Sequence, residues 1–353
     1  MASIPISRSP RILICRLSAI GDCVLTMPMA VALRKLYPHA WITWVTQSPG
    51  ASLLCNHASV DEVITVSRGW TKSPRAIWKL RQRLRSLKLD WALDPQSLTK
   101  SALAAWVSAA PRRIGFAPPQ GRELAPWCNN ERIERTAEHV ADAFLQLLQP
   151  LGIEEPVVDF QMPRDEEAER QMASYCEMQF AETRFAVVNP GAGWDSRLWP
   201  LDRYSQVASF LGGCEGIPSL VTWAGDRERV WAEEIVANSK GHAILAPPTS
   251  LPELVAVSRR ATFFISPDTG PMHIAAAVNV PCISLHGTTK AGSSGPYGSQ
   301  HVKLQAYFQS GTSRYRRRAL NDAMQAIPVE WVCQAARQIL ERSEQQSEKA
   351  DAA

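Results

Sequence analysis

One octapeptide of the chain combines residue types that could bind a phosphorylated ligand. Residues 266–273 read Ser-Pro-Asp-Thr-Gly-Pro-Met-His and lie between the apolar run Ala261–Ile265 and a helix-like stretch. The free backbone N–H groups at the start of a helix suit a phosphate group. Asp268 and Thr269 could also hold the hydroxyls of a sugar or ribose. The alternative is a plain helix N-cap, for which Asp and Thr are common without any ligand.

A second candidate is an acid that follows the first apolar run of the chain. The segment Arg16-Leu17-Ser18-Ala19-Ile20-Gly21-Asp22 comes directly after Ile12–Cys15. Gly21 permits a close approach of the backbone, and Asp22 falls in the first turn of the next expected helix. The helix dipole keeps a carboxylate there ionised, as a general base requires, but an ordinary first-turn acid has the same position. The segment has no GxGxxG pattern, so a dinucleotide fingerprint is not supported.

A third candidate is the glycine-rich segment Asn189-Pro190-Gly191-Ala192-Gly193-Trp194-Asp195-Ser196-Arg197-Leu198-Trp199-Pro200, which also follows an apolar run. Gly191 and Gly193 let the backbone approach a ligand closely. Arg197 is a permanent forked cation that suits a diphosphate. It is not a Walker A loop, because no Gly-Lys-Ser/Thr follows. The alternative is a turn between a strand and a helix with a surface arginine.

Two more segments end apolar runs in the same half of the chain. Glu228, in Trp223-Ala224-Gly225-Asp226-Arg227-Glu228, could accept hydrogen bonds from ribose hydroxyls, or could be an ordinary first-turn acid. His286-Gly287-Thr288-Thr289, with Gly295-Pro296-Tyr297-Gly298 beyond it, is interpreted as the wall of a binding cleft or as a loop without function.

The first half of the chain also holds a strongly cationic stretch. No acid occurs between residues 63 and 89, which contain Lys72, Arg75, Lys79, Arg81, Arg83, Arg85 and Lys88. Lys100, Arg112, Arg113 and Arg122 follow downstream. The pattern is typical of a solvated helix face, and it also fits an anionic partner such as a phosphorylated glycolipid at a membrane surface. No nucleic-acid motif accompanies the charge.

The composition is that of a globular protein with more than one domain. The chain has 353 residues, of which 45% are apolar and 20% charged, and its net charge is only +4. Such a charge creates no field that points to nucleic acid. The eight cysteines are scattered without CxxC spacing, which fits a reducing compartment. No run is long enough for a membrane span, so we expect a cytoplasmic protein, and peripheral attachment to a membrane is compatible with this.

Short apolar runs alternate with stretches of helical period, which predicts parallel sheets with crossover helices. The strands predicted in the first half are Ile12–Cys15, Trp41–Val45, Val63–Val66, Trp91–Leu93 and Arg113–Phe116, and the helices are Cys23–Leu36, Pro74–Leu87, Lys100–Ala109 and Thr136–Leu148. The strands predicted in the second half are Phe185–Asn189, Ser219–Trp223, Ile244–Leu245, Phe263–Ser266 and Cys282–Leu285, and the helices are Leu201–Leu211, Arg227–Ser239, Leu251–Arg259, Met272–Val278 and Val329–Arg342.

We therefore predict an α/β protein of two doubly wound domains, at residues 1–160 and 161–342, whose ligand loops face a central cleft. Residues 153–175 are charged and of weak strand character, and are interpreted as a linker and the entry to the second domain. The polar tail 343–353 is predicted to be disordered.

Together, these segments resemble the lipopolysaccharide heptosyltransferases, the ADP-heptose-dependent inverting glycosyltransferases of family 9. The matching segments are ILICRLSAIGDCVLTMPMAVALRKLYP at 12–38, DPQSLTKSAL at 94–103, RRIGF at 112–116, NPGAGWDSRLWP at 189–200, SPDTGPMHIAAAVNVPCISLHGTT at 266–289 and GPYG at 295–298. The resemblance implies a GT-B fold of two Rossmann-like domains, with a final helix that could cross back to the first.

The resemblance also implies roles for individual residues. The catalytic aspartate of the family matches Asp22. The diphosphate-binding lysine of the family falls on Arg197, and the small polar residues that precede it in many members fall on Ala192 and Gly193, where only backbone N–H groups could replace their hydroxyls. The sugar-nucleotide loop matches Asp268, Thr269, Gly270 and His273, a ribose-binding acid matches Glu228, and the acceptor side resembles the segments of Lys100 and Arg113.

The implied reaction moves a heptose from ADP-heptose to an anionic glycolipid of the inner core. Asp22 takes the proton of the acceptor hydroxyl, while Arg197 and the helix start at Thr269–Met272 stabilise the departing diphosphate. No DxD-like motif is present, so neither a metal nor a cofactor is expected. The alternatives are a transferase for another nucleotide sugar, a hydrolysing epimerase, or a non-catalytic GT-B protein that binds a glycan, glycolipid or protein; nucleic-acid binding is more distant.

Overall fold

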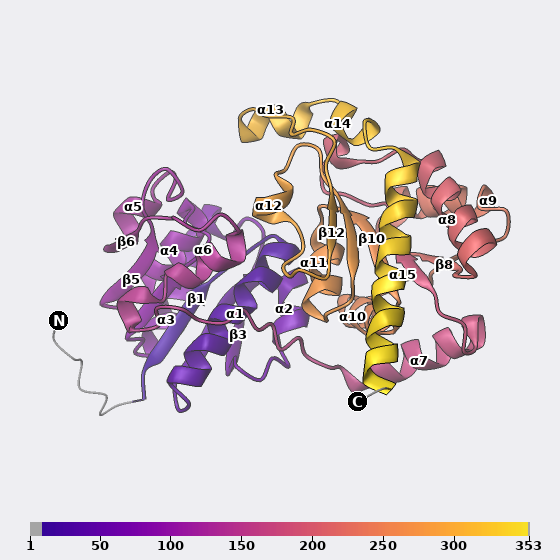
Figure 1. Ribbon diagram of the computed structural model, residues 1–353. Coiled ribbons are helices and arrows are strands. Elements are labelled where there is room, and N and C mark those ends of the chain that lie inside the picture. Colours follow the sequence, from indigo (N-terminus) through magenta and orange to yellow (C-terminus); the bar gives the residue numbers. More distant parts are fainter. Residues whose placement is uncertain (1–8, 352–353) are drawn as a thin grey trace. The chain divides into compact units, whose positions relative to one another are not determined.

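The computed structural model describes residues 9–351, which divide into two compact units on either side of the Pro163–Arg164 bond (Figure 1). Each unit contains a six-stranded parallel sheet covered by helices. Within residues 9–351, every helix is too short or too polar to span a lipid bilayer.

The sheet of the first unit has the strand order β3-β2-β1-β4-β5-β6. Its strands are β1 (Arg11–Cys15), β2 (Trp41–Gln47), β3 (Glu62–Val66), β4 (Trp91–Asp94), β5 (Arg112–Phe116) and β6 (Glu131–Ile133). Its helices are α1 (Ile20–Leu36), α2 (Ser48–Leu54), α3 (Pro74–Ser86), α4 (Thr99–Val107), α5 (Ala125–Cys128) and α6 (Val140–Gln146), with 3-10 turns η1 (Trp70–Lys72) and η2 (Gln149–Leu151). The order reverses between β1 and β4, where open α/β sheets bind their ligands.

The second unit repeats this connectivity in the order β12-β11-β10-β7-β8-β9. Its strands are β7 (Ala186–Val188), β8 (Ser219–Val221), β9 (Ala243–Leu245), β10 (Phe263–Pro267), β11 (Cys282–Leu285) and β12 (Val302–Leu304). Its helices are α7 (Glu166–Phe180), α8 (Leu201–Glu215), α9 (Gly225–Ala237), α10 (Leu251–Arg260), α11 (Gly270–Ala277), α12 (Ala291–Ser294), α13 (Ser313–Arg318), α14 (Asp322–Gln325) and α15 (Val329–Asp351), with the 3-10 turn η3 (Asp195–Arg197). The order reverses between β7 and β10.

Burial explains why the predicted strands and helices form. Residues 12–15 of the central strand β1 are all buried, so this strand appears in the sequence as an unbroken apolar run. In α15, by contrast, Val332, Ala336, Ile339 and Leu340 recur at helical spacing and enter the core of the second unit. This long helix, yellow in Figure 1, packs against α8, β11 and β12. The predicted strands and helices are confirmed, with ends that differ by a few residues.

The interpretation of residues 153–175 as linker is wrong in its second half, because Glu166–Phe180 form helix α7. Ala168, Met172, Cys176 and Phe180 recur every four residues and form its buried face. The Asp165 side chain caps the helix by accepting a hydrogen bond from the backbone N–H of Ala168. The many charges of this segment lie on the solvent side and hide its period. The sequence reasoning also missed α2 and the short edge strands β6 and β12.

The predicted disordered tail is also corrected, because α15 continues through Ser343 to Asp351. Residues 343–351 contain neither Gly nor Pro, and six of the nine are Glu, Gln, Lys or Ala. Such residues extend an existing helix at little cost, because the unfavourable nucleation step has already occurred. Residues 352–353 of the tail lie outside the described residues.

Candidate active site

Asp22 lies at the switch point of the first unit, in the first turn of α1. Arg16, which follows β1 and has a buried side chain, places its Nη2 2.6 Å from Asp22 Oδ2. The same oxygen accepts a hydrogen bond from the backbone N–H of Ala19, whereas Oδ1 makes no hydrogen bond to any described residue. The Asp22 side chain is 41% exposed. One carboxylate oxygen is therefore held in place while the other is open to accept a proton.

Lys100, which follows the neighbouring strand β4, lies close to Asp22 and Arg16. It lies in the first turn of α4, and its Nζ donates a hydrogen bond to Ser18 Oγ at 2.6 Å. Burial and the neighbouring Arg16 lower the pKa of Lys100, while the nearby Asp22 acts in the opposite direction. Arg16 also donates to the carbonyl of Pro95, so the loops after β1 and β4 are tied together. The carboxyl end of this sheet therefore combines the exposed carboxylate of Asp22 with the two cations Arg16 and Lys100.

Arg113 does not lie at the carboxyl end of the sheet, where Asp22 and Lys100 are found. In the register of the sheet it lies opposite Ala92, two positions before the pair formed by Asp94 and Gly115 at the carboxyl end. Its guanidinium donates to the backbone carbonyls of Cys128 and Ala110. These bonds hold the β5–β6 connection, and they place Arg113 toward the amino end of the strand, away from Asp22 and Lys100.

Asp94 is a buried carboxyl group at the switch point that the sequence reasoning did not single out. It accepts hydrogen bonds from the backbone N–H of Ser97 and from Asn129 Nδ2. Burial raises the pKa of Asp94 to about 6 despite these bonds and the nearby Arg16. Its bonds shape the loop that carries Lys100. A buried acid after an apolar strand is visible in the sequence, but its partners come from distant segments.

In the second unit, Arg197 and Asp268 meet at the switch point between β7 and β10. Arg197 Nη1 donates a hydrogen bond to the carbonyl oxygen of Asp268 at 2.8 Å and lies 3.6 Å from its Oδ2. His273 Nε2 lies 3.5 Å from Asp268 Oδ1, and Ser294 Oγ donates to Oδ2. Burial alone would raise the pKa of Asp268, but the bond from His273 and the charge of Arg197 hold it well below its usual range. The neighbouring groups of this site therefore favour the ionised form of Asp268, which in turn binds Arg197.

Thr269 and Gly270 form the start of α11, directly after Asp268. Thr269 is the N-cap residue, and its side chain makes no capping hydrogen bond. Pro271 has no N–H group, so Gly270 and Met272 supply the backbone donors of the first turn. Both the helix dipole and these donors favour an anion at this position.

The glycine-rich loop after β7 packs against Glu228 of α9. A Cβ placed on Gly191 would lie 2.4 Å from the carboxyl atoms of Glu228, so a larger residue there would displace the Glu228 carboxylate. Glu228 accepts a hydrogen bond from the backbone N–H of Ala224, and burial raises its pKa. Ala192 is partly exposed and Gly193 is exposed, with open space where a Cβ of residue 193 would lie. The fold thus brings together the loops of all the predicted donor-binding residues.

Two aromatic–cation contacts at this site were missed from the sequence. The guanidinium carbon of Arg197 lies 4.0 Å from the ring centroid of Trp194, and that of Arg317 in α13 lies 4.8 Å from the same ring. Arg316 fixes α13 by donating to the carbonyl of Thr288. The only sequence signal is the arginine-rich run at residues 313–318, which gives no hint of its partner.

Two buried histidines of the second unit should make its stability sensitive to acid. Burial lowers the pKa of His286 and of His301 from the usual 6.5 to about 4. Unfolding lets both bind protons at their ordinary pKa, so the free energy of unfolding should fall as pH decreases from about 6.5 to about 4. The maximal slope is about 1.4 kcal/mol per pH unit for each histidine. The urea midpoint measured over this range tests the prediction.

The control for this pH effect is the variant His286→Gln, whose amide can still bond Ser284, the partner of His286 Nε2. Its midpoint should depend less steeply on pH than that of the unmodified chain. The opposite contribution of Asp94, whose pKa is raised, is present in both proteins and cancels in the difference. Identical pH slopes would show that His286 does not titrate as described.

The described residues 9–351 contain no group of three or more His, Cys, Asp or Glu side chains placed to hold a metal ion. The charged groups of the two switch points are instead the acid–cation group of Asp22, Arg16 and Lys100 and the buried pair of Arg197 and Asp268.

Comparisons with known proteins match this architecture. The model of the family "Glycosyltransferase family 9 (heptosyltransferase)" matches residues 77–324. Lipopolysaccharide heptosyltransferase 1 of Pseudomonas aeruginosa is 28% identical over 320 residues, covering 84% of each chain. Lipopolysaccharide heptosyltransferase 3 of Escherichia coli K12 is 25% identical over 330 residues, covering 91% of this chain and 95% of the relative.

Solved structures agree on the fold. A family 9 glycosyltransferase from Veillonella parvula superposes with a TM-score of 0.79 at 23% identity, covering 94% of this chain and 97% of that one. The Escherichia coli heptosyltransferase WaaC with ADP superposes with a TM-score of 0.75 at 23% identity, covering 93% and 99%. The chain therefore belongs to glycosyltransferase family 9, as a heptosyltransferase-like enzyme of the GT-B fold class.

Proposed function

We propose that the protein transfers a heptose from ADP-heptose to an inner-core lipopolysaccharide acceptor, with inversion and without a metal ion. The observation that carries the proposal is the pair formed by Arg197 and Asp268 at the start of α11, because it combines a fixed cation with free helix N–H donors. Two solved relatives support the choice of donor, since they are heptosyltransferase WaaC with ADP and with ADP-2-deoxy-2-fluoro heptose.

The donor would bind to the second unit. Arg197, the α11 N-terminus and Arg317 would balance the charge that develops on the departing diphosphate. Glu228 would accept hydrogen bonds from ribose hydroxyls, and the backbone of Ala192 and Gly193 would approach the phosphates closely. Asp268 would not react, because its oxygens face His273, Ser294 and Arg197. Its role would be to hold these donors in place.

The acceptor would bind to the first unit. The open Oδ1 of Asp22 would take the proton of the attacking hydroxyl, which is almost never ionised at neutral pH without such a base. The hydroxyl oxygen would then form the new bond to the anomeric carbon of the donor, while the bond from that carbon to the diphosphate breaks. Lys100 would attract the anionic groups of the acceptor. A nucleotide sugar and a glycolipid meet where the cytoplasm borders a membrane, so we place the reaction at that face.

A thermal-shift panel of ADP-, UDP-, GDP- and CDP-sugars tests the donor. We expect ADP-heptose to raise the melting temperature clearly, because a ligand that binds only the folded state stabilises it in proportion to the logarithm of its concentration over Kd. ADP-glucose is the matched control, since it keeps the nucleotide and diphosphate and changes only the sugar. A response to UDP- or GDP-sugars alone would overturn the heptose proposal and favour another family 9 transferase. Binding of ADP-heptose without turnover on acceptor would favour a non-catalytic binding protein.

A further inference from the structure

The first unit exposes an unusual set of large aromatic side chains on one layer of helices. Trp78 of α3 is 55% exposed, Trp106 of α4 is 57% exposed and Trp127 of α5 is 85% exposed. They are the three most exposed tryptophans among residues 9–351. Helix α3 packs against α4 and α4 packs against α5, so the three rings belong to neighbouring elements. Scattered exposed apolar residues are ordinary, but three exposed tryptophans on adjoining helices form a candidate interaction surface.

Helix α4 shows how selective this exposure is. Its residues from Ser101 to Val107 are buried or partly buried except Trp106. The helix packs between α3 and α5, so only a small part of its surface is exposed to solvent. Trp106 lies in that exposed part. Leu124, immediately before α5, adds a further apolar side chain at 58% exposure. Solvation alone would favour a polar residue at such positions.

The tryptophans are accompanied by cations on α3. Arg75, Arg81 and Arg85 lie three before, three after and seven after Trp78, so they share its side of the helix. All three are exposed, and no ion pair involving them is formed with any residue that the structure describes. Two acids of neighbouring segments are already engaged, since Glu62 pairs with Arg83 and Glu123 accepts from the backbone N–H of Thr99. The field at this surface is therefore positive.

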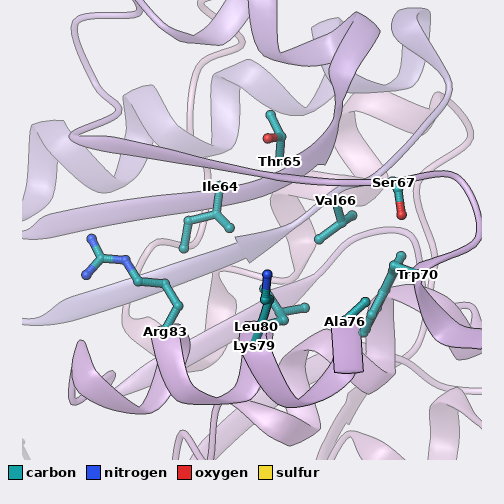
Figure 2. A pocket seen from close by; sticks show the side chains of 9 residues that line it. All are labelled: Ile64, Thr65, Val66, Ser67, Trp70, Ala76, Lys79, Leu80 and Arg83. Carbon is teal, nitrogen blue, oxygen red and sulfur yellow. The ribbon is translucent and has the colours of Figure 1, made fainter. Parts of the chain in front are cut away.

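The other side of α3 faces the sheet edge and has a different character. A pocket of about 290 Å³ lies there between α3 and β3, with Ile64, Val66, Trp70 and Leu80 as its apolar lining. Figure 2 shows Lys79 and Arg83 reaching from the helix toward this pocket. Lys79 and Arg83 are four residues apart and occupy that stripe, whereas Trp78, Arg81 and Arg85 are spaced so that they lie on a different side of the helix. Arg75 lies four residues before Lys79 and three before Trp78, at the border between the two sides. The side of α3 that lines the pocket, with Lys79 and Arg83, is therefore distinct from the side that exposes Trp78.

We propose that the surface formed by Arg75, Trp78, Arg81, Arg85, Trp106, Leu124 and Trp127 docks the protein on a bilayer of anionic phospholipid. Tryptophan is favoured at the boundary between headgroups and acyl chains, where its apolar ring and polar N–H are both satisfied. Clustered arginines are attracted to an anionic leaflet. A protein partner would need complementary acids and a matching shape, whereas a bilayer requires only the exposed rings and the positive field. The inference goes beyond the proposed function and holds whichever sugar is transferred.

Sedimentation of the full chain with vesicles tests this surface. Vesicles of equal phosphatidylglycerol and phosphatidylcholine, free of any glycolipid, should bind the protein, and pure phosphatidylcholine vesicles should bind it far more weakly. Binding should fall steeply between 0.05 and 0.5 M salt, where exposed charges are progressively screened, as is expected from roughly threefold shorter screening lengths. Equal binding to both kinds of vesicle, or to neither, would overturn the proposal.

Two combined variants separate the aromatic and charged contributions. Trp78→Ser with Trp106→Ser and Trp127→Ser should weaken vesicle binding at least about tenfold. Arg75→Gln with Arg81→Gln and Arg85→Gln should weaken it by roughly fivefold per charge. The matched controls lie in the second unit: Trp331→Ser, a tryptophan 42% exposed on α15, and Arg314→Gln with Arg318→Gln on α13. These controls should bind vesicles as the unmodified chain does.

The melting temperature and the transfer activity of each variant show whether a loss of vesicle binding has another cause. The melting temperature of each variant must stay within a few degrees of the unmodified chain, and single substitutions replace any combination that fails this criterion. Transfer to a delipidated, water-soluble acceptor should be unchanged in both combined variants, which distinguishes a lost membrane contact from a failure of the proposed reaction. A tryptophan variant that loses self-association while keeping its vesicle binding would show instead that a second copy of the chain covers this surface.

Discussion

Replacement of Asp22 by Asn is expected to lower kcat by about a thousandfold and to leave the affinity for the donor within about twofold. A positioned general base contributes roughly a hundred- to ten-thousandfold to rate, and an amide cannot accept the hydroxyl proton. Steady-state kinetics with ADP-heptose and acceptor measure kcat, and calorimetry with ADP measures donor affinity. Because the loops proposed to bind the donor belong to the second unit, this substitution should not disturb them. Near-normal transfer by the variant would remove Asp22 from the mechanism.

The matched control for this variant is Asp142→Asn. Asp142 occupies the same third position of α6 that Asp22 occupies in α1, so both substitutions remove a first-turn carboxylate from a helix of the same unit. A general loss of helix stability would affect both variants alike. Only the Asp22 variant should lose transfer. Its melting temperature is also needed, because Arg16 is left without its carboxylate partner, although its bond to the carbonyl of Pro95 remains.

Replacement of Arg197 by Ala is expected to raise the Kd for ADP and the KM for the donor by roughly 10- to 100-fold. A hydrogen bond to a charged group contributes about 1.5–3 kcal/mol, which corresponds to this range. The guanidinium is oriented for this task by Asp268 on one side and by the ring of Trp194 on the other. Calorimetric titration with ADP measures the change. An unchanged Kd would show that the diphosphate binds elsewhere.

Two further variants define the charge requirement. Arg197→Lys keeps the charge that the family's lysine supplies but loses the planar fork, so its donor affinity should lie between those of the unmodified chain and Arg197→Ala. Arg227→Ala is the matched control, because Arg227 is an exposed arginine of the same unit that also stacks on a tryptophan, Trp231, and pairs with Asp195. It should bind ADP normally. Equal losses in Arg227→Ala and Arg197→Ala would indicate a nonspecific effect of net charge.

The sequence was sufficient to place the loops at strand ends, and insufficient to place side chains within them. Asp22 and Asp268 could be placed at strand ends because an apolar run followed by a turn and a helix is a local pattern, and parallel strands align their carboxyl ends; their roles in the reaction stay predictions. Arg113 could not be placed along its strand, because its position depends on the register between β4 and β5, which no local pattern specifies; its role on the acceptor side stays a prediction. The contact of Arg317 with Trp194 joins segments that are distant in the chain, so the sequence could not reveal it.

Helix α7 illustrates a different limit. Its apolar residues are few and have the spacing of a helix, but charged neighbours dominate the average hydropathy of the segment. What fixes it in place is tertiary: Glu169 is held by Arg259 and Arg260 of α10. Packing of this kind overrides weak local preference, and a single chain contains no direct sign of it.

The two glycines of the loop after β7 differ in what they allow a protein engineer to change. A side chain at position 191 would displace the carboxylate of Glu228, which occupies that space. Gly193 has open space in every direction in which a Cβ could point, and its backbone is one that other residues can adopt. If this loop binds the donor as proposed, position 193 is the natural entry point for redesigning donor selectivity. A serine or threonine introduced there, alone or with one at Ala192, would provide the hydroxyls that many members of the family carry, without first remodelling the loop.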